Sequence, residues 1–204
     1  MIASKTRKLT LAGVLVAAAV LGGLFSFPVL GSRCAPIQHL VNILAAVFLG
    51  PLWGVGIAFA ASLLRNIAGV GSLMAFPGSM IGALLCGLAY YGTKRIGITC
   101  IAEAFGTGIL GALAAYPVAA FLMGLNPGSY TVYIVPFLLS TGAGSILAYV
   151  TPPAAEAAAE VKNCMTKAPV RDVLIARMGA SCFRNVFQCL FCTDVRLSVR
   201  IPRM

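Results

Sequence analysis

The chain has 204 residues, of which 60% are hydrophobic and 10% are charged. Soluble domains carry about 45–50% apolar and about 25% charged residues, so this composition and a mean hydropathy of +0.96 exclude an ordinary water-soluble domain. The net charge of +10 lies mainly near the ends of the chain, which is typical of topology-setting charge rather than of a basic nucleic-acid groove.

Six apolar segments separated by turn-forming residues predict an all-α integral membrane protein, a bundle of about six transmembrane helices. Gly50-Pro51, Arg65-Asn66 and Thr93-Lys94-Arg95 end the second, third and fourth segments, since such residues interrupt apolar helices. These three segments are shorter than the roughly 20 residues of an upright span, so a reentrant pair is the alternative. The predicted segments are residues 9–30, 37–49, 52–64, 74–91 (or 79–91), 104–123 and 130–150.

Basic residues cluster at three places in the chain. They lie at residues 5–8, at Lys94-Arg95 and in residues 151–204, which hold eight of the 15 lysines and arginines. With six spans all three places fall on one side, which the positive-inside rule identifies as the cytoplasm. We therefore predict a multi-pass cell-membrane protein whose N-terminus and C-terminus are both cytoplasmic.

Polar side chains gather near the three predicted outer loops, at about residues 31–37, 66–78 and 124–130. Polar groups within a membrane protein are costly and usually mark a site or a pathway. A substrate site is therefore predicted at this end of the bundle. Its candidate residues are Arg33, Gln38, His39, Asn42, Arg65, Asn66, Phe76, Ser79, Tyr116 and Ser140.

Two groups of these candidates suggest a role in hydrogen bonding. Gln38 and Asn42 are four residues apart and share a helix face beside His39, which predicts a wall for a heterocyclic ligand. Hydrogen bonds between helices are the alternative. Arg65 either binds an anionic or carbonyl group, braces the outer loop, or extends to the lipid headgroups.

The aromatic candidates lie beside prolines. Phe76-Pro77-Gly78-Ser79 predicts a loop returning into a helix that Ser79 caps, with Phe76 stacking on a flat ligand or packing in the core. Tyr116-Pro117 and Pro136, one turn before Ser140, predict two kinked helices. Kinked helices suit a cavity, although they also occur as plain bundle shape.

No catalytic set, metal site or cofactor is predicted. Glu103 is the only carboxylate before residue 156, and we expect it on the inner side, away from the polar loops. The run Gly106–Gly111 matches G-x-G-x-x-G but follows no strand, so it predicts close helix packing. His39 is the only histidine, and Cys189 and Cys192 have no second pair nearby. The sequence has no nucleotide-binding loop and no acidic residue securely placed within the membrane. Any uphill transport would therefore need an external energy source.

Small residues four apart on the first segment allow another helix to approach closely. They are Gly13 with Ala17 and Ala18 with Gly22. The approaching helix would belong either to a partner subunit or to this chain.

Seven runs resemble the ThiW family of substrate-binding S components of energy-coupling factor (ECF) vitamin transporters, and the resemblance covers about residues 8–150. The run from Ala75 to Gly82 is the most specific of them. The runs are Ser32–His39, Leu49–Pro51, Gly56–Asn66, Gly71–Gly82, Glu103–Gly108, Ala115–Ala119 and Pro136–Ser140.

The resemblance implies an ATP-driven importer of a thiamine precursor, hydroxyethylthiazole. It also implies a transmembrane coupling subunit, which would meet Gly13, Ala17 and Ala18, and two ATPase subunits. A self-sufficient channel, an intramembrane enzyme and a ligand-free scaffold are the alternatives.

The chain divides into a transmembrane substrate-binding domain at 1–150 and a basic, Cys-rich tail at 151–204. Family members end soon after the sixth helix, so the tail departs from their pattern. It is interpreted as disordered, out of frame or a real cytoplasmic extension.

Overall fold

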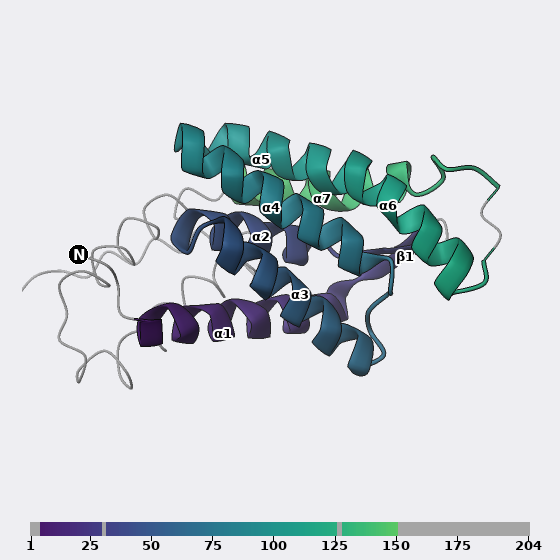
Figure 1. Cartoon of the computed structure of the whole chain (residues 1–204), viewed down its shortest axis with the longest axis horizontal. Coiled ribbons are helices and arrows are strands. Elements are labelled where there is room, and N and C mark those ends of the chain that lie inside the picture. The colour runs from purple at the N-terminus through teal and green to yellow at the C-terminus, as the bar shows by residue number, and fades with distance from the viewer. Residues whose placement is uncertain (1–4, 30–31, 126–127, 151–204) are drawn as a thin grey trace, which may run out of the picture.

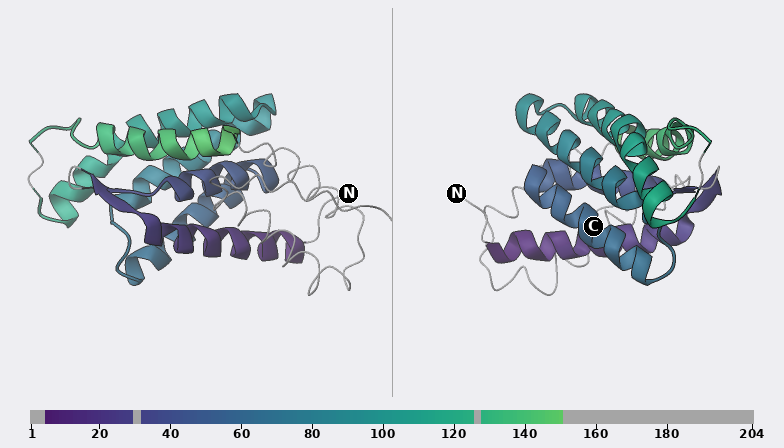
Figure 2. Two further views of the ribbon diagram at one scale, coloured as in Figure 1. Left: turned by 180° about the vertical axis from the view of Figure 1, so that it is seen from behind. Right: turned by 45° about the vertical axis from the view of Figure 1, so that its right-hand side comes forward.

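The computed structural model describes residues 5–29, 32–125 and 128–150, and the predicted tail lies outside them. Within these residues the fold is the predicted all-α bundle, with six helical segments running roughly parallel or antiparallel (Figures 1 and 2). The segments are α1 (Lys5–Gly22), α2 (Pro36–Phe48), α3 (Pro51–Ile67), α4 (Ala75–Thr93), the continuous run from α5 (Ile96–Phe105) to η3 (Val118–Leu122), and α7 (Ile134–Val150).

Two of the three predicted turns end helices where the sequence predicts, whereas α3 continues through Arg65 and Asn66 to Ile67. Gly50, at φ +89°, separates α2 from α3, and Pro51 begins α3, where its missing N–H costs nothing. Lys94 ends α4 in the left-handed conformation at φ 54°. Gly69, at φ +73°, follows α3, and the N–H groups of Val70 and Gly71 both donate to the Arg65 carbonyl.

The first segment differs from its prediction. Its helix ends at Gly22, and the short helix η1 (Gly23–Phe25) leads into a hairpin of β1 (Phe27–Val29) and β2 (Ser32–Cys34). The strands pair antiparallel, with Phe27 opposite Cys34. Apolar length alone did not reveal the hairpin because its first strand extends the apolar run.

The fifth segment begins at Ile96 rather than at the predicted Ala104. It passes through a π-helical stretch, η2 (Gly106–Gly111), then α6 (Ala112–Pro117) and a second π-helical stretch, η3. Such stretches occur mostly as insertions within α-helices, frequently at functional sites.

The short helix α2 lies at the centre of the bundle, packed against α1, α3, α4, α5 and α7. Every residue from Gln38 to Ala46 is buried. At 1.5 Å per residue its 13 residues extend about 20 Å, well short of a roughly 30 Å hydrocarbon core. The first turn of α2 therefore lies below the outer loops instead of at the surface.

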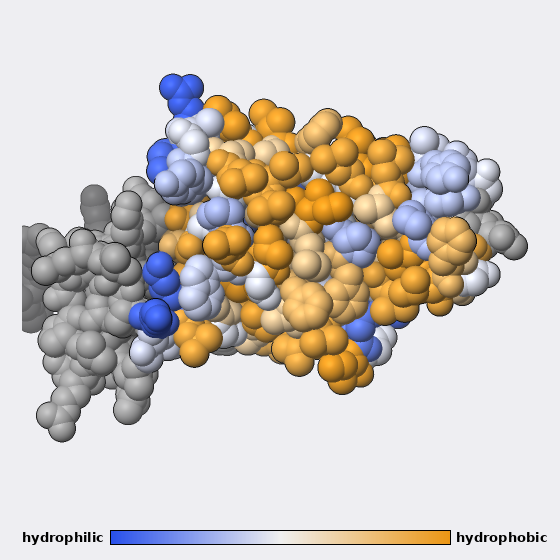
Figure 3. Space-filling view, viewed as in Figure 1, coloured by the Kyte–Doolittle hydropathy of each residue, from blue (hydrophilic) through white to orange (hydrophobic). Residues whose placement is uncertain are grey.

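Exposed apolar side chains form a belt around the helices, between more polar ends (Figure 3). In the described part of the chain, three helical stretches are long and apolar enough to cross a membrane, and three shorter apolar helices accompany them. The long stretches are Lys8–Phe25, Ala75–Thr93 and Ile96–Leu122. The described chain begins and ends at one end of the bundle, which it shares with the α4–α5 turn (Figure 2). The hairpin and the loop between α3 and α4 lie at the other end, here called the outer end (Figure 1).

Close glycine contacts join the fifth segment to α4, as the G-x-G-x-x-G run predicts. A Cβ added at Gly111 would lie 2.6 Å from the Gly78 Cα and 3.1 Å from its carbonyl oxygen. Gly111→Ala is therefore expected to lower the free energy of unfolding by about 1–3 kcal/mol, because two backbones must separate. Gly142→Ala in α7 is the control, since nothing lies within 4 Å of its added Cβ. Thermal unfolding in detergent measures both, and equal midpoints would contradict the prediction.

Candidate functional site

A pocket of about 410 Å³, including the space at its mouth, lies at the outer end of the bundle. Its residues come from β2 and the first turn of α2, from α3, the loop before α4, α4, η2 and α7. The lining residues are Arg33, Ala35, Gln38, His39, Arg65, Ser72, Ala75, Gly78, Ser79, Thr107, Phe137 and Ser140.

Arg65 brings a buried charge to this pocket, with only 2% of the residue exposed. One of its terminal nitrogens, Nη1, donates to the Gln38 carbonyl oxygen, whereas Nε has no partner among the described residues. Gly23 leaves the space that the guanidinium occupies, since a Cβ there would collide with Nε. Arg65 does not extend outward to headgroups, so that alternative is wrong.

A chain of polar groups continues from Gln38 between the helices. The Gln38 amide donates to the Ser62 hydroxyl at 3.1 Å, and Ser62 lies 3.0 Å from the Ser79 hydroxyl. Ser79 also donates to the Ala75 carbonyl at 2.7 Å. It lies inside α4, which begins at Ala75, so the predicted helix cap at Ser79 is wrong. These bonds fix the pocket wall and leave Arg65 as its strongest free donor.

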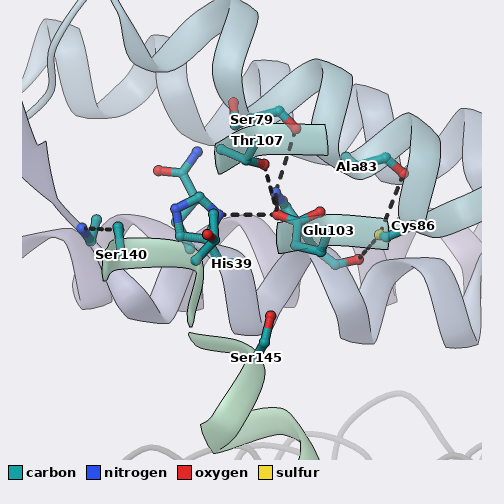
Figure 4. A network of polar contacts seen from close by, with 12 residues as sticks. His39, Ser79, Ala83, Cys86, Glu103, Thr107, Ser140 and Ser145 are labelled. Atoms are coloured by element: carbon teal, nitrogen blue, oxygen red, sulfur yellow. Dashed lines mark hydrogen bonds and ion pairs between the residues drawn. The ribbon is translucent and has the colours of Figure 1, made fainter. Parts of the chain in front are cut away.

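Glu103 lies beneath the pocket, fully buried in α5. One of its carboxyl oxygens, Oε1, is 3.0 Å from His39 Nδ1, 2.9 Å from Asn42 Nδ2 and 3.2 Å from the Thr107 hydroxyl. Figure 4 shows the His39 ring between Glu103 and Ser140. The expectation that Glu103 lies on the inner side is wrong, because α5 begins at Ile96 and carries Glu103 about two turns into the bundle. A buried acid is therefore present.

The rim of the pocket joins the hairpin to α7. The backbone N–H of Ala35 donates to the Ser140 hydroxyl at 2.8 Å, and the Cys34 thiol donates to the Pro136 carbonyl at 3.2 Å. Burial raises the pKa of the Cys34 thiol, so the protonated donor form is favoured. Arg33 is exposed and completes the rim.

The remaining predicted residues do not line the pocket. Asn42 holds Glu103 from below, and Asn66 donates to the Ser62 and Ser72 carbonyls, which fixes the loop above. Phe76 packs against Phe59, with ring centroids 5.7 Å apart.

Tyr116 stacks on Tyr130 at a centroid distance of 3.9 Å. Phe137 supplies an aromatic face in the pocket instead. Phe137 was not among the predicted site residues, although it lies within the run Pro136–Ser140. Five other lining residues were not predicted either, namely Ala35, Ser72, Ala75, Gly78 and Thr107.

The small residues of α1 divide between two surfaces. Gly13 and Ala17 are exposed, and nothing lies within 4 Å of a Cβ added at Gly13. Ala18 is buried in the core, and Gly22 packs on Ile37. Only Gly13 and Ala17 are therefore placed to face lipid or another subunit.

A helical bundle with an apolar belt and a pocket lined by polar side chains at one end is the architecture of a membrane protein with a candidate site for a small solute (Figure 3). Residues 9–156 match the family model described as thiamine-precursor transporter protein (ThiW), and the chain belongs to this family. The family consists of transporters, so the chain is a transporter component and not an enzyme. No curated protein and no solved structure matches the chain.

Proposed function

We propose that the chain is the membrane-embedded substrate-binding subunit of an ATP-driven ECF importer, and that its substrate is hydroxyethylthiazole. The outer pocket is the observation that carries the proposal. Phe137 offers a ring an apolar face, and Arg65 and His39 offer it polar contacts. The family description supplies the substrate class.

The proposed partners are a transmembrane coupling subunit, approaching the exposed Gly13 and Ala17, and two ATPase subunits. The sequence contains no nucleotide-binding loop, so ATP hydrolysis would come from these partners. We propose that both termini face the cytoplasm, because the basic residues at the start of α1 and in the α4–α5 turn belong to the end of the bundle opposite the pocket (Figures 1 and 2). The pocket then opens to the outside.

Binding to the purified full chain tests the substrate. We expect hydroxyethylthiazole to bind with a Kd of about 1 μM or below, which corresponds to about 8 kcal/mol, by isothermal titration calorimetry in detergent. Thiamine and hydroxymethylpyrimidine serve as comparison compounds. Binding of none of the three would overturn the substrate assignment.

The buried Glu103 favours a second candidate, a self-sufficient transporter driven by protons, because buried acids serve proton relays. Uptake into liposomes separates the two. Uptake that requires the coupling subunit, the ATPases and ATP supports the importer. Uptake by the chain alone under a proton gradient supports the second candidate.

A further inference from the structure

Two donors that meet at Glu103 Oε1, from Asn42 and Thr107, establish this oxygen as an acceptor. Asn42 Nδ2 lies 2.9 Å from Oε1 and 3.4 Å from the Ser79 carbonyl oxygen. Because a carbonyl oxygen only accepts hydrogen bonds, the Asn42 amide must direct its NH₂ group toward both oxygens. The Thr107 hydroxyl approaches the same Oε1. A proton on the carboxyl group would therefore have to reside on Oε2, and Oε1 accepts in either charge state.

This acceptor determines which nitrogen of His39 carries the proton. His39 Nδ1, 3.0 Å from Oε1, must donate. In a neutral imidazole the other nitrogen, Nε2, is then an acceptor. No described residue hydrogen-bonds Nε2, and His39 lines the pocket. The acceptor is consequently available to a ligand.

The other polar groups of the pocket differ from Nε2 in what they offer. Arg33 and Arg65 have donors only. The Gln38 carbonyl oxygen already accepts from Arg65, and the Ser140 hydroxyl already accepts from Ala35. The Ser79 hydroxyl is engaged with Ser62 and Ala75. The hydroxyl and carbonyl oxygens each keep a second lone pair, but His39 Nε2 is the one nitrogen among these groups that accepts, and it has no partner among the described residues.

We propose that Glu103 is a positioning residue that holds His39 in the Nδ1–H tautomer, and that His39 Nε2 selects ligands carrying a hydrogen-bond donor. The ligand class is a small ring compound with an acceptor for Arg65 and a hydroxyl or N–H donor for His39. This inference rests on the proposed function for its ligand, since the hydroxyethyl group of the thiazole would supply the donor.

Nitrogen NMR tests the tautomer without any ligand. His39 is the only histidine of the chain, so ¹⁵N-histidine labelling, with a purification tag that has no histidine, gives one unambiguous imidazole signal. We expect a protonated Nδ1 and an unprotonated Nε2 at neutral pH, unchanged in Glu103→Gln, which retains Oε1. A proton on Nε2, alone or on both nitrogens, would overturn the proposal.

Three probe compounds test the selection. Hydroxyethylthiazole should bind about threefold to tenfold more tightly than its ethyl analogue, the worth of one hydrogen bond. Its methyl ether, which accepts but cannot donate, should bind no better than the ethyl compound. An ether that binds as tightly as the alcohol would show that Nε2 donates and would overturn the proposal.

His39→Asn is the matched variant. Its amide nitrogen takes the place of Nδ1 against Glu103, while the Nε2 position is lost. The variant should bind the alcohol and the ethyl compound equally. A retained preference would place the hydroxyl elsewhere and overturn the role of His39. Failure of the wild-type chain to bind any probe would instead contradict the proposed substrate and leave the NMR result as the test of the tautomer.

Discussion

Glu103→Leu is expected to lower the free energy of unfolding by about 3–5 kcal/mol, the cost of removing one partner from a buried polar pair. Leucine has a similar size but no acceptor, so the donors of His39, Asn42 and Thr107 lose their shared oxygen in the centre of the bundle. Water cannot replace it, because all three residues are buried. Thermal and SDS unfolding in detergent measure the loss.

Glu103→Gln is the control for the loss of charge alone. Its amide retains Oε1 for the three donors, and its NH₂ group occupies the Oε2 position, where the carboxylate already lacks a partner among the described residues. We expect a loss of about 1 kcal/mol, the difference between a charged and a neutral acceptor. A Glu103→Leu chain as stable as wild type would contradict the prediction and show that apolar packing compensates for the network, as it does in some buried ion pairs.

The helix ends that the sequence predicted well are those fixed by local geometry. Gly50-Pro51 and Lys94-Arg95 act on the backbone within a residue or two, through a positive φ, a missing N–H or a charge that stays at the membrane surface. Such constraints do not depend on the rest of the fold. The ends of α2 and α4 and the start of α3 therefore followed from the residues themselves.

Glu103 was misplaced because its environment is not local. A lone acid favoured starting the fifth helix after it, while its partner His39 lies 64 residues away on α2. One signal was present in the sequence. Thr99, Glu103 and Thr107 are four apart and form a polar stripe on one helix face, and all three are buried. The pair Gln38 and Asn42 forms a second stripe, and Asn42 meets the first one at Glu103.

Six of the ten candidate residues line one pocket, whereas the two aromatic candidates do not. Arg33, Gln38, His39, Arg65, Ser79 and Ser140 line one pocket, because polar residues near the ends of apolar helices turn toward each other. Phe76 and Tyr116 pack against Phe59 and Tyr130 instead. An aromatic ring packs equally well against a neighbouring side chain or a ligand. The sequence alone could therefore not show that Phe137, rather than Phe76 or Tyr116, faces the pocket.

Arg65→Met is expected to weaken hydroxyethylthiazole binding by about tenfold to 100-fold, the worth of one hydrogen bond to a charged group. Methionine keeps the unbranched stem that packs beside Gly23 and removes the guanidinium from the pocket. The Gln38 amide retains its bond to Ser62. Calorimetric titration of the full chain measures the affinity, and Arg65→Lys shows how much of it survives with the charge alone.

The same variant should be about as stable as wild type, because the loss of the Nη1 bond to the Gln38 carbonyl oxygen offsets the removal of a partly unpaired buried cation. Arg65 is a buried cation whose Nε lacks a partner among the described residues, and unpaired buried polar groups destabilise a fold. Replacing it with an apolar side chain of similar length removes that cost. A residue that raises affinity without adding stability is placed for binding rather than for bracing. Unchanged affinity together with a lower unfolding midpoint would assign Arg65 a structural role and remove it from the site.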